Sequence, residues 1–162
     1  MLKITKLWLD GDAFAADSRR NITDKTAPLF GWTVDYDSES GTTTVYLKHR
    51  PTVSTEANKP LSRVRVLLDP GHGQDDNGAT GSAGFTAPVE KDANLAEALA
   101  AKHRLEQLGA TVMMTRSDDT FYTLAQRLQM VNELRPDYFI AVHHNSAALT
   151  SDLNENGGTE CY

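Results

Sequence analysis

The chain has 162 residues and a mass of 17.8 kDa, which suits one domain, or one domain with a small module. Hydrophobic residues make up 40% of it, so a core can form, yet no apolar run reaches the roughly 20 residues that a membrane helix needs. The net charge of −6 argues against a nucleic-acid partner, and the single Cys161 excludes an internal disulfide framework.

Residues 1–50 are expected to form a small β-rich module. Residues 31–37 alternate apolar and polar side chains, which is the period of a strand, and residues 38–41 are turn formers. Residues 42–47 are rich in β-branched and aromatic side chains, so the two segments predict a β-hairpin. Residues 51–62 are polar and bounded by prolines, and we interpret them as a linker.

The acidic excess lies entirely in residues 63–162, where strand and helix patterns alternate. Strands are expected over residues 63–69, 111–115 and 138–143, and helices over residues 92–108 and from a cap at Asp119 or Thr120 to Leu134. The order β-α-β-α-β predicts right-handed crossovers. The expected fold class is therefore α/β, with three layers: a mostly parallel sheet and helices on both of its faces.

Three side chains that could bind a metal stand at the ends of these elements. His72 follows the first strand in DPGHG, and His143 ends the third strand in AVHHNS. Glu90 comes just before the first helix, whose N-terminus favours a carboxylate. Because the carboxyl ends of parallel strands share one sheet edge, we expect the three to converge. Two imidazoles and one carboxylate leave a fourth zinc position open, although each residue alone is more often a plain loop or helix-start residue.

Residues 64–162 resemble the catalytic domain of zinc-dependent N-acetylmuramoyl-L-alanine amidases, the amidase_3 family of bacterial cell-wall hydrolases. The resemblance is carried by VLLDPGHG (66–73), GATG (78–81), residues 89–119, residues 124–147 and GGTECY (157–162). It implies that Zn²⁺ is the cofactor and that His72, Glu90 and His143 are its ligands.

The resemblance also implies a function and a location. The expected reaction is zinc-dependent hydrolysis of the amide bond between N-acetylmuramic acid and L-alanine in peptidoglycan, by a monomer that is extracellular or associated with the cell wall. Peptidoglycan is then the partner, and neither nucleic acid nor a membrane span is expected. Acidic residues at Asp10 and Asp12 precede any hydrophobic stretch of signal length, so no secretory signal peptide is expected in this chain.

The family's general-base Glu lies on a later strand than the one that begins GGTECY, and the chain stops at Tyr162. We therefore expect the zinc domain of residues 63–162 to be partial at its C-terminus, and the catalytic base to be unknown. Glu160 occupies a position that is commonly acidic in the family but is not that of its base, and it is the candidate that remains. The activity of this chain stays open.

Two alternatives from other functional classes also stay open. The chain could be a non-catalytic fragment that binds zinc or cell wall, because it lacks the base. It could also be a structural module whose histidines and glutamate are merely solvated.

Neighbouring residues have simpler interpretations. Alternation along the strand points His144 away from His143, so we do not expect it to bind metal. Asn145 is more typical of a turn than of a substrate contact. Cys161 has no basic neighbours that would activate a thiol nucleophile.

Residues 30–47 carry FGWTVDYD followed by TTTVYL, which resembles the end of a copper-amine-oxidase N-terminal-like module. That module is often attached to secreted wall enzymes. No copper ligands are visible in this segment.

Overall fold

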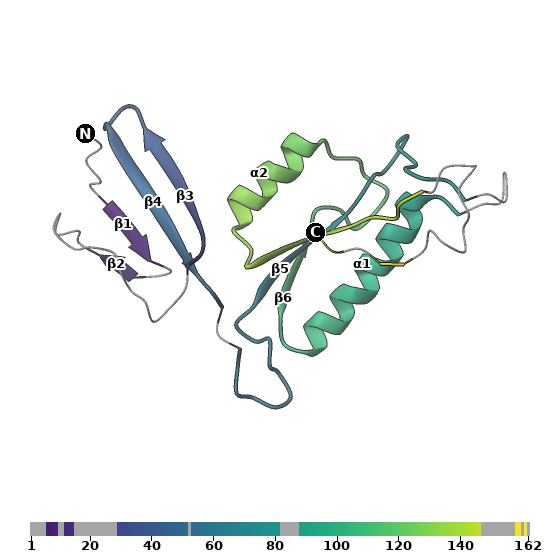
Figure 1. The fold of residues 1–162 in the computed structure, drawn as a ribbon, viewed down its shortest axis with the longest axis horizontal. Coiled ribbons are helices and arrows are strands. Elements are labelled where there is room, and N and C mark those ends of the chain that lie inside the picture. The colour runs from purple at the N-terminus through teal and green to yellow at the C-terminus, as the bar shows by residue number, and fades with distance from the viewer. Residues whose placement is uncertain are drawn as a thin grey trace. The chain divides into compact units, whose positions relative to one another are not determined.

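The computed structural model describes residues 6–9, 12–14, 29–51, 53–81, 88–146, 158, 159 and 161. The chain forms two compact units that divide between Thr52 and Val53, and Figure 1 shows the elements of each. In the part of the chain so described, no helix is both long enough and apolar enough to cross a lipid bilayer.

The first unit is a four-stranded sheet in the order β2-β1-β4-β3. Its strands are β1 (Lys6–Leu9), β2 (Asp12–Phe14), β3 (Leu29–Asp37) and β4 (Thr42–His49). The hairpin predicted from the sequence is confirmed, because β3 and β4 pair antiparallel across the turn at residues 38–41. Asp37 stabilises that turn, since its carboxylate accepts hydrogen bonds from the backbone N–H of Glu39 and of Ser40.

The second unit is a parallel sheet of three strands that alternate with two helices along the chain (Figure 1). The elements are β5 (Arg65–Pro70), α1 (Glu90–Gln107), β6 (Thr111–Met114), α2 (Leu124–Leu134) and β7 (Tyr138–Val142). Both β6 and β7 pair in parallel with β5, which is the central strand. The predicted α/β fold class is confirmed.

The two faces of β5 meet different helices. Its Val66 and Leu68 pack against Ala98 of α1, and this contact is the centre of the hydrophobic core. Further apolar side chains surround it: Leu61, Ala101, Leu105, Val112, Met114 and Val142. Because side chains alternate along a strand, Leu67 and Asp69 lie on the opposite face. There Asp69 forms an ion pair with Arg127 of α2.

The helix α2 begins later than the sequence predicts. Its N-cap is Thr123, whose hydroxyl accepts a hydrogen bond from the backbone N–H of Gln126, while the Gln126 side chain accepts one from the backbone N–H of Thr123. This reciprocal capping box satisfies two backbone donors that the helix leaves free. The predicted cap at Asp119 or Thr120 is wrong, because Thr120 instead donates to the side chain of Asp118 in the preceding turn.

Residues 54–62 form turns that are tied to the second unit. The backbone N–H of Ser54 donates to the carbonyl oxygen of Pro60 at 2.9 Å, and that of Leu61 donates to the carbonyl oxygen of Leu108 at 2.9 Å. The first bond closes a loop within residues 51–62, the segment interpreted as a linker, and the second holds the end of that segment against the C-terminus of α1. That residues 1–50 fold independently of residues 63–162 stays a prediction.

Limited proteolysis tests this division of the chain. With a protease of broad specificity, we expect the first cut between Arg50 and Lys59, because Glu56, Ala57 and Asn58 are exposed in turns there. Intact-mass measurement of the early fragments locates the cut. A first cut within Arg65–Pro70 would contradict the prediction, because that strand is the buried centre of the second unit.

Two leucine substitutions test where the core lies. Leu67 is 0% exposed, whereas Leu128 on α2 is 60% exposed. We expect Leu67→Ala to lower the free energy of unfolding by about 2–5 kcal/mol, because it removes buried methyl groups and leaves a cavity. The matched Leu128→Ala variant should stay within about 0.5 kcal/mol of the wild type. Urea denaturation followed by circular dichroism measures both, and equal losses would contradict this placement of the core.

Candidate metal centre

His72 lies in a tight turn directly after β5. Its φ of 65° is in the left-handed region, which residues other than glycine seldom adopt. Gly73 and Asp76 close the turn by exchanging two backbone hydrogen bonds of 3.0 Å. The reversal brings the Asp76 carboxylate beside the imidazole, with Oδ2 of Asp76 2.9 Å from Nδ1 of His72.

The contact between Asp76 and His72 orients the ring. The hydrogen bond with His72 lowers the pKa of Asp76, and an ionised carboxylate can only accept, so Nδ1 of His72 is the donor side of this contact. In the neutral imidazole, Nε2 then keeps a lone pair. A carboxylate bonded to the other nitrogen is the usual partner of a histidine that binds a metal.

Glu90 is the first residue of α1, and its carboxylate is buried. Oε2 accepts a hydrogen bond from the backbone N–H of Ala79 at 2.7 Å, and Oε1 accepts one from the backbone N–H of His144 at 2.9 Å. The side-chain amide of Asn94, one turn further along α1, donates to Oε1 at 3.3 Å. Burial raises the pKa of Glu90, but these hydrogen bonds and that from His143 outweigh it and lower the pKa from 4.5 to about 2. Glu90 is therefore ionised at neutral pH.

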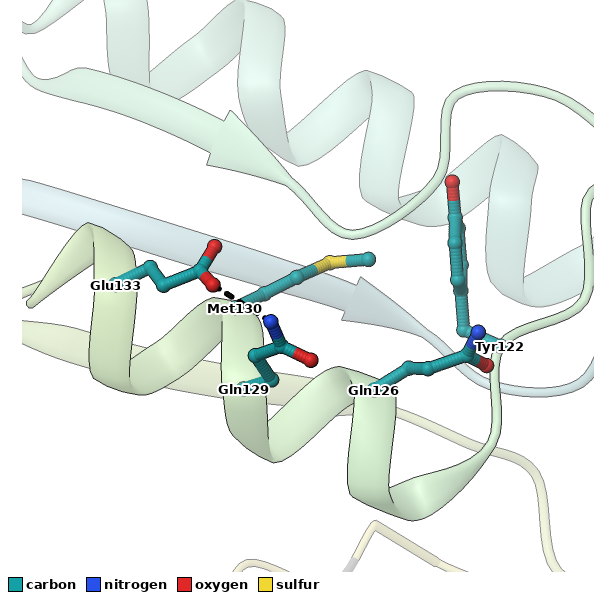
Figure 2. Close-up of a pocket in the computed structure, with 5 residues that line it drawn as sticks. All are labelled: Tyr122, Gln126, Gln129, Met130 and Glu133. Carbon is teal, nitrogen blue, oxygen red and sulfur yellow. Dashed lines mark hydrogen bonds between the residues drawn. The ribbon is translucent and has the colours of Figure 1, made fainter.

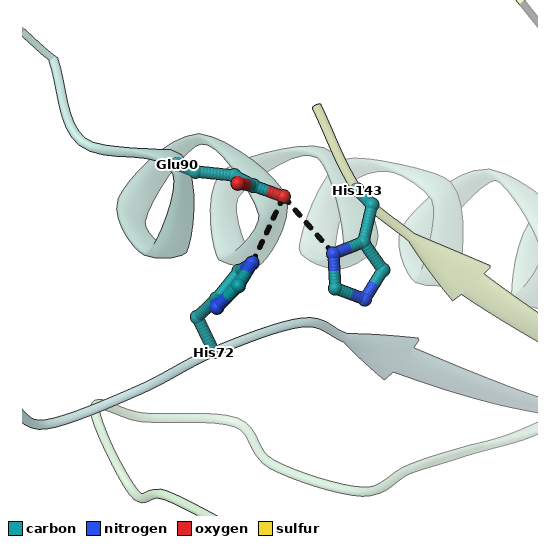
Figure 3. A group of neighbouring side chains, drawn as sticks. All are labelled: His72, Glu90 and His143. Carbon is teal, nitrogen blue, oxygen red and sulfur yellow. Dashed lines mark hydrogen bonds and ion pairs between the residues drawn. The ribbon is translucent and has the colours of Figure 1, made fainter. Parts of the chain in front are cut away.

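The side chains of His72, Glu90 and His143 meet at one point, although they come from three separate segments (Figure 3). Oε1 of Glu90 lies 3.1 Å from Nε2 of His72 and 3.0 Å from Nδ1 of His143. The two imidazole rings are edge to face, with centroids 5.0 Å apart. Within the described ranges this is the only group of three such side chains whose ligand atoms all lie within 4.8 Å of one another. The strand order predicted their convergence.

Two glycines leave the space that this cluster occupies. A Cβ atom on Gly71 would overlap the imidazole of His143. A Cβ atom on Gly78 would overlap both the imidazole of His72 and the carboxylate of Glu90, and Gly78 also has a φ of 65°. In the sequence the two stand within DPGHG and GATG, and nothing in their spacing singles them out as the residues that make room for the cluster.

The ring of His144 points to other partners than that of His143. Its Nδ1 lies 2.7 Å from Oδ1 of Asn94, and its Nε2 lies 3.0 Å from Oε1 of Glu97, both on α1. Sequence reasoning missed Asn94, which is 0% exposed. The spacing of four residues after Glu90, one helical turn, is a signal that could have found it.

The remaining residues that the sequence raised are not part of this cluster. Asn145 is exposed, and Cys161 is a free and exposed thiol. Glu160, the candidate base, lies outside the described residues.

A separate cavity of about 200 Å³ lies along α2 (Figure 2). Its lining residues are Tyr122, Gln126, Gln129, Met130 and Glu133. It includes no member of the histidine and glutamate cluster, and its one internal hydrogen bond in Figure 2 joins Gln129 to Glu133 at 2.7 Å. The group of side chains that could hold a metal ion lies elsewhere, at the sheet edge, so the candidate site is that cluster.

Comparison with known proteins relates the region that contains the cluster to a protein family. Residues 66–162 match the model of the family described as N-acetylmuramoyl-L-alanine amidase. N-acetylmuramoyl-L-alanine amidase LytC of Bacillus subtilis (strain 168) is 32% identical over 110 residues, which are 68% of this chain and 21% of that protein. Probable cell wall amidase LytH of Staphylococcus aureus is 38% identical over 106 residues, which are 65% of this chain and 33% of that protein.

Among solved structures, Cwp6 from Clostridium difficile superimposes with a TM-score of 0.50 and 36% sequence identity, over 53% of this chain and 13% of that one. The chain thus spans well under half the length of each of these three proteins. The family match, by contrast, covers more than half of this chain and contains all three residues of the cluster. The chain therefore belongs to the N-acetylmuramoyl-L-alanine amidase family.

Proposed function

We propose that this chain is a zinc-dependent N-acetylmuramoyl-L-alanine amidase that hydrolyses the amide bond between N-acetylmuramic acid and L-alanine in bacterial peptidoglycan. The observation that carries the proposal is the meeting of His72, Glu90 and His143 within 4.8 Å, in a domain of the amidase family. The names of LytC and LytH, an amidase and a probable cell wall amidase, support a place of action at the wall, outside the cell. That the chain is a monomer stays a prediction.

The donor set fits zinc. Two imidazole nitrogens and one carboxylate oxygen are ligands that zinc takes in catalytic sites, whereas magnesium and calcium prefer oxygen alone. Ligands about 2.0–2.2 Å from a tetrahedral zinc ion lie roughly 3.4 Å from one another. The separations of 3.1 Å and 3.0 Å between Glu90 Oε1 and the two ring nitrogens are close to that spacing. We infer that His72, Glu90 and His143 would hold the ion.

Zinc, when bound, supplies Lewis acidity that polarises a scissile carbonyl and activates water at neutral pH. The chain's own residues prepare the site for it. Glu90 stays ionised because its pKa is about 2, and it therefore offers a negative charge at neutral pH. Asp76 accepts at Nδ1 of His72, and in the neutral ring that tautomer makes Nε2 available as a ligand. Three protein ligands leave a fourth position for water or substrate.

The general base remains to be assigned. Among the described residues, the carboxylates of Glu90 and Asp76 are both engaged, the first by hydrogen bonds from Ala79, His144, His143 and Asn94 and the second by His72. Glu160 stays the candidate that the sequence provides. The alternative of a fragment that only binds zinc or wall is not favoured, because the matched family is described by its amidase activity.

Metal binding by single variants tests the ligand set. We expect the wild type to retain one Zn²⁺ per chain after dialysis, and His72→Ala, Glu90→Ala and His143→Ala each to lose most of it, because each removes one of three protein ligands. His144→Ala should keep its metal, because the contact of His144 with Glu90 is made by the backbone N–H. Atomic emission spectroscopy measures the metal content.

His103 provides a matched control, because it is an exposed histidine on α1 that is not in the cluster. His103→Ala should bind zinc as the wild type does. Equal loss of metal from His143→Ala and His144→Ala would contradict the assignment of His143 as the ligand.

Turnover of purified peptidoglycan tests the reaction itself. We expect the zinc-loaded wild type to release peptides with new amino-terminal L-alanine, and His143→Ala to be slower by at least about 10²-fold, because metal stabilisation of the transition state contributes several kcal/mol. Labelling of the new amines, followed by mass spectrometry, identifies the bond that is cut. Zinc binding without any release of amines would support the binding fragment instead, and His103→Ala serves again as the control.

A further inference from the structure

Two buried arginines hold the backbone that carries His72. Arg116, just after β6, is 3% exposed, and Arg127, in α2, is 6% exposed. We propose that this pair, the carbonyl clamp, consists of positioning residues that set His72 in place for metal binding. The proposal rests on the metal centre proposed above and goes beyond its three ligands.

Arg116 reaches the turn from the loop that follows β6. Its Nε donates to the carbonyl oxygen of Pro70 at 2.9 Å, and its Nη2 donates to that of Gly71 at 2.8 Å. The other two hydrogen bonds, to the carbonyl oxygens of Lys91 at 2.7 Å and Asp118 at 2.8 Å, anchor the guanidinium to the first turn of α1 and to its own loop. All four bonds end on backbone carbonyl oxygens, so the buried guanidinium stabilises the positions of the backbone segments around it.

Arg127 reaches the same turn from a helix. Its Nη1 donates to the carbonyl oxygen of Pro70 at 3.1 Å, and its Nη2 donates to that of His72 at 3.2 Å. Nη1 also forms an ion pair with the carboxylate of Asp69, and Nε donates to the carbonyl oxygen of Tyr122 at 2.9 Å. Between them, the two arginines therefore bind three consecutive carbonyl oxygens, those of Pro70, Gly71 and His72.

The backbone at this point needs such support. A left-handed φ in a residue other than glycine raises the free energy by roughly 1–3 kcal/mol, and it persists where the surroundings fix it from several sides. His72 has a φ of 65°, and it is the residue whose ring enters the cluster. A relaxation of His72 to an ordinary φ would reorient its carbonyl and its ring together. The carbonyl clamp opposes that relaxation.

The geometry of arginine matters here as well as its charge. The guanidinium is planar and carries five N–H donors in a rigid fork, so one side chain can bind two carbonyls at fixed angles. The ammonium of a lysine keeps the charge but lacks the fork. A change of arginine to lysine therefore separates geometry from charge.

The test compares Arg116→Lys and Arg127→Lys with the wild type. Arg104→Lys is the matched control, because Arg104 is exposed and the one side-chain hydrogen bond of its guanidinium among the described residues goes to Gln107. Zinc affinity is measured by competition with a chromogenic chelator, on protein that circular dichroism shows to be folded in EDTA. We expect the dissociation constant of each clamp variant to rise about 10–100-fold, as is typical when the groups that orient a ligand are removed, and that of Arg104→Lys to stay unchanged.

The possible outcomes distinguish a role of the arginines in zinc affinity from a role in fold stability alone, and both from the absence of a metal centre. Urea denaturation without metal, run in parallel, gives the stability of each variant. Reduced stability with wild-type zinc affinity in both clamp variants would overturn the proposal, because the arginines would then only stabilise the fold. Failure of both variants to fold would overturn it for the same reason. A wild type that binds no zinc would instead overturn the metal centre itself, and the clamp with it.

Discussion

The carboxylate of Glu90 is the contact on which the arrangement of the second unit's sheet edge depends. It stands at the start of α1 and accepts two backbone hydrogen bonds. One comes from the N–H of Ala79 in the loop before that helix, and the other from the N–H of His144 after β7. A buried charge is unfavourable unless its lone pairs are satisfied, and here both oxygens are engaged. The same bonds that stabilise the charge therefore also fix the distance between helix and strands. The cluster is set by the fold itself.

The sequence predicts the location of this cluster because location follows from local patterns. The apolar run before His72 and the one that ends at His143 predict strands from their local composition alone. Parallel strands place their carboxyl ends at the same edge of the sheet. In the structure β5 and β7 are neighbours, which brings the two residues within reach of each other. The start of α2 was less predictable, because Thr120 and Thr123 are both acceptable caps and only the reciprocal bond with Gln126 decides between them.

The supporting residues were beyond reach of the sequence for a different reason. Arg116 contacts a carbonyl 46 residues away, and Arg127 contacts one 57 residues away. No local periodicity reports such contacts, and arginine is normally read as a surface residue. Asp76 is nearer, four residues after His72, but only the unusual backbone of that turn brings its carboxylate to the ring. Ligands can thus be found from pattern, whereas the groups that orient them depend on tertiary structure.

The bare backbone at Gly71 and Gly78 has a consequence for how mutational surveys of this protein should be interpreted. The three atoms nearest to a methyl group at Gly71 all belong to the imidazole ring of His143, so that ring must move to make room. None of the residues of the hydrophobic core lies at this position, so such a variant would keep its core, and yet its imidazole would be displaced from Glu90. Screens that score abundance would record the position as tolerant, while screens that score function would record it as intolerant. The functionally essential positions therefore include more than the residues whose side chains could bind the metal. They also include glycines beside the cluster, where any side chain would displace a ligand.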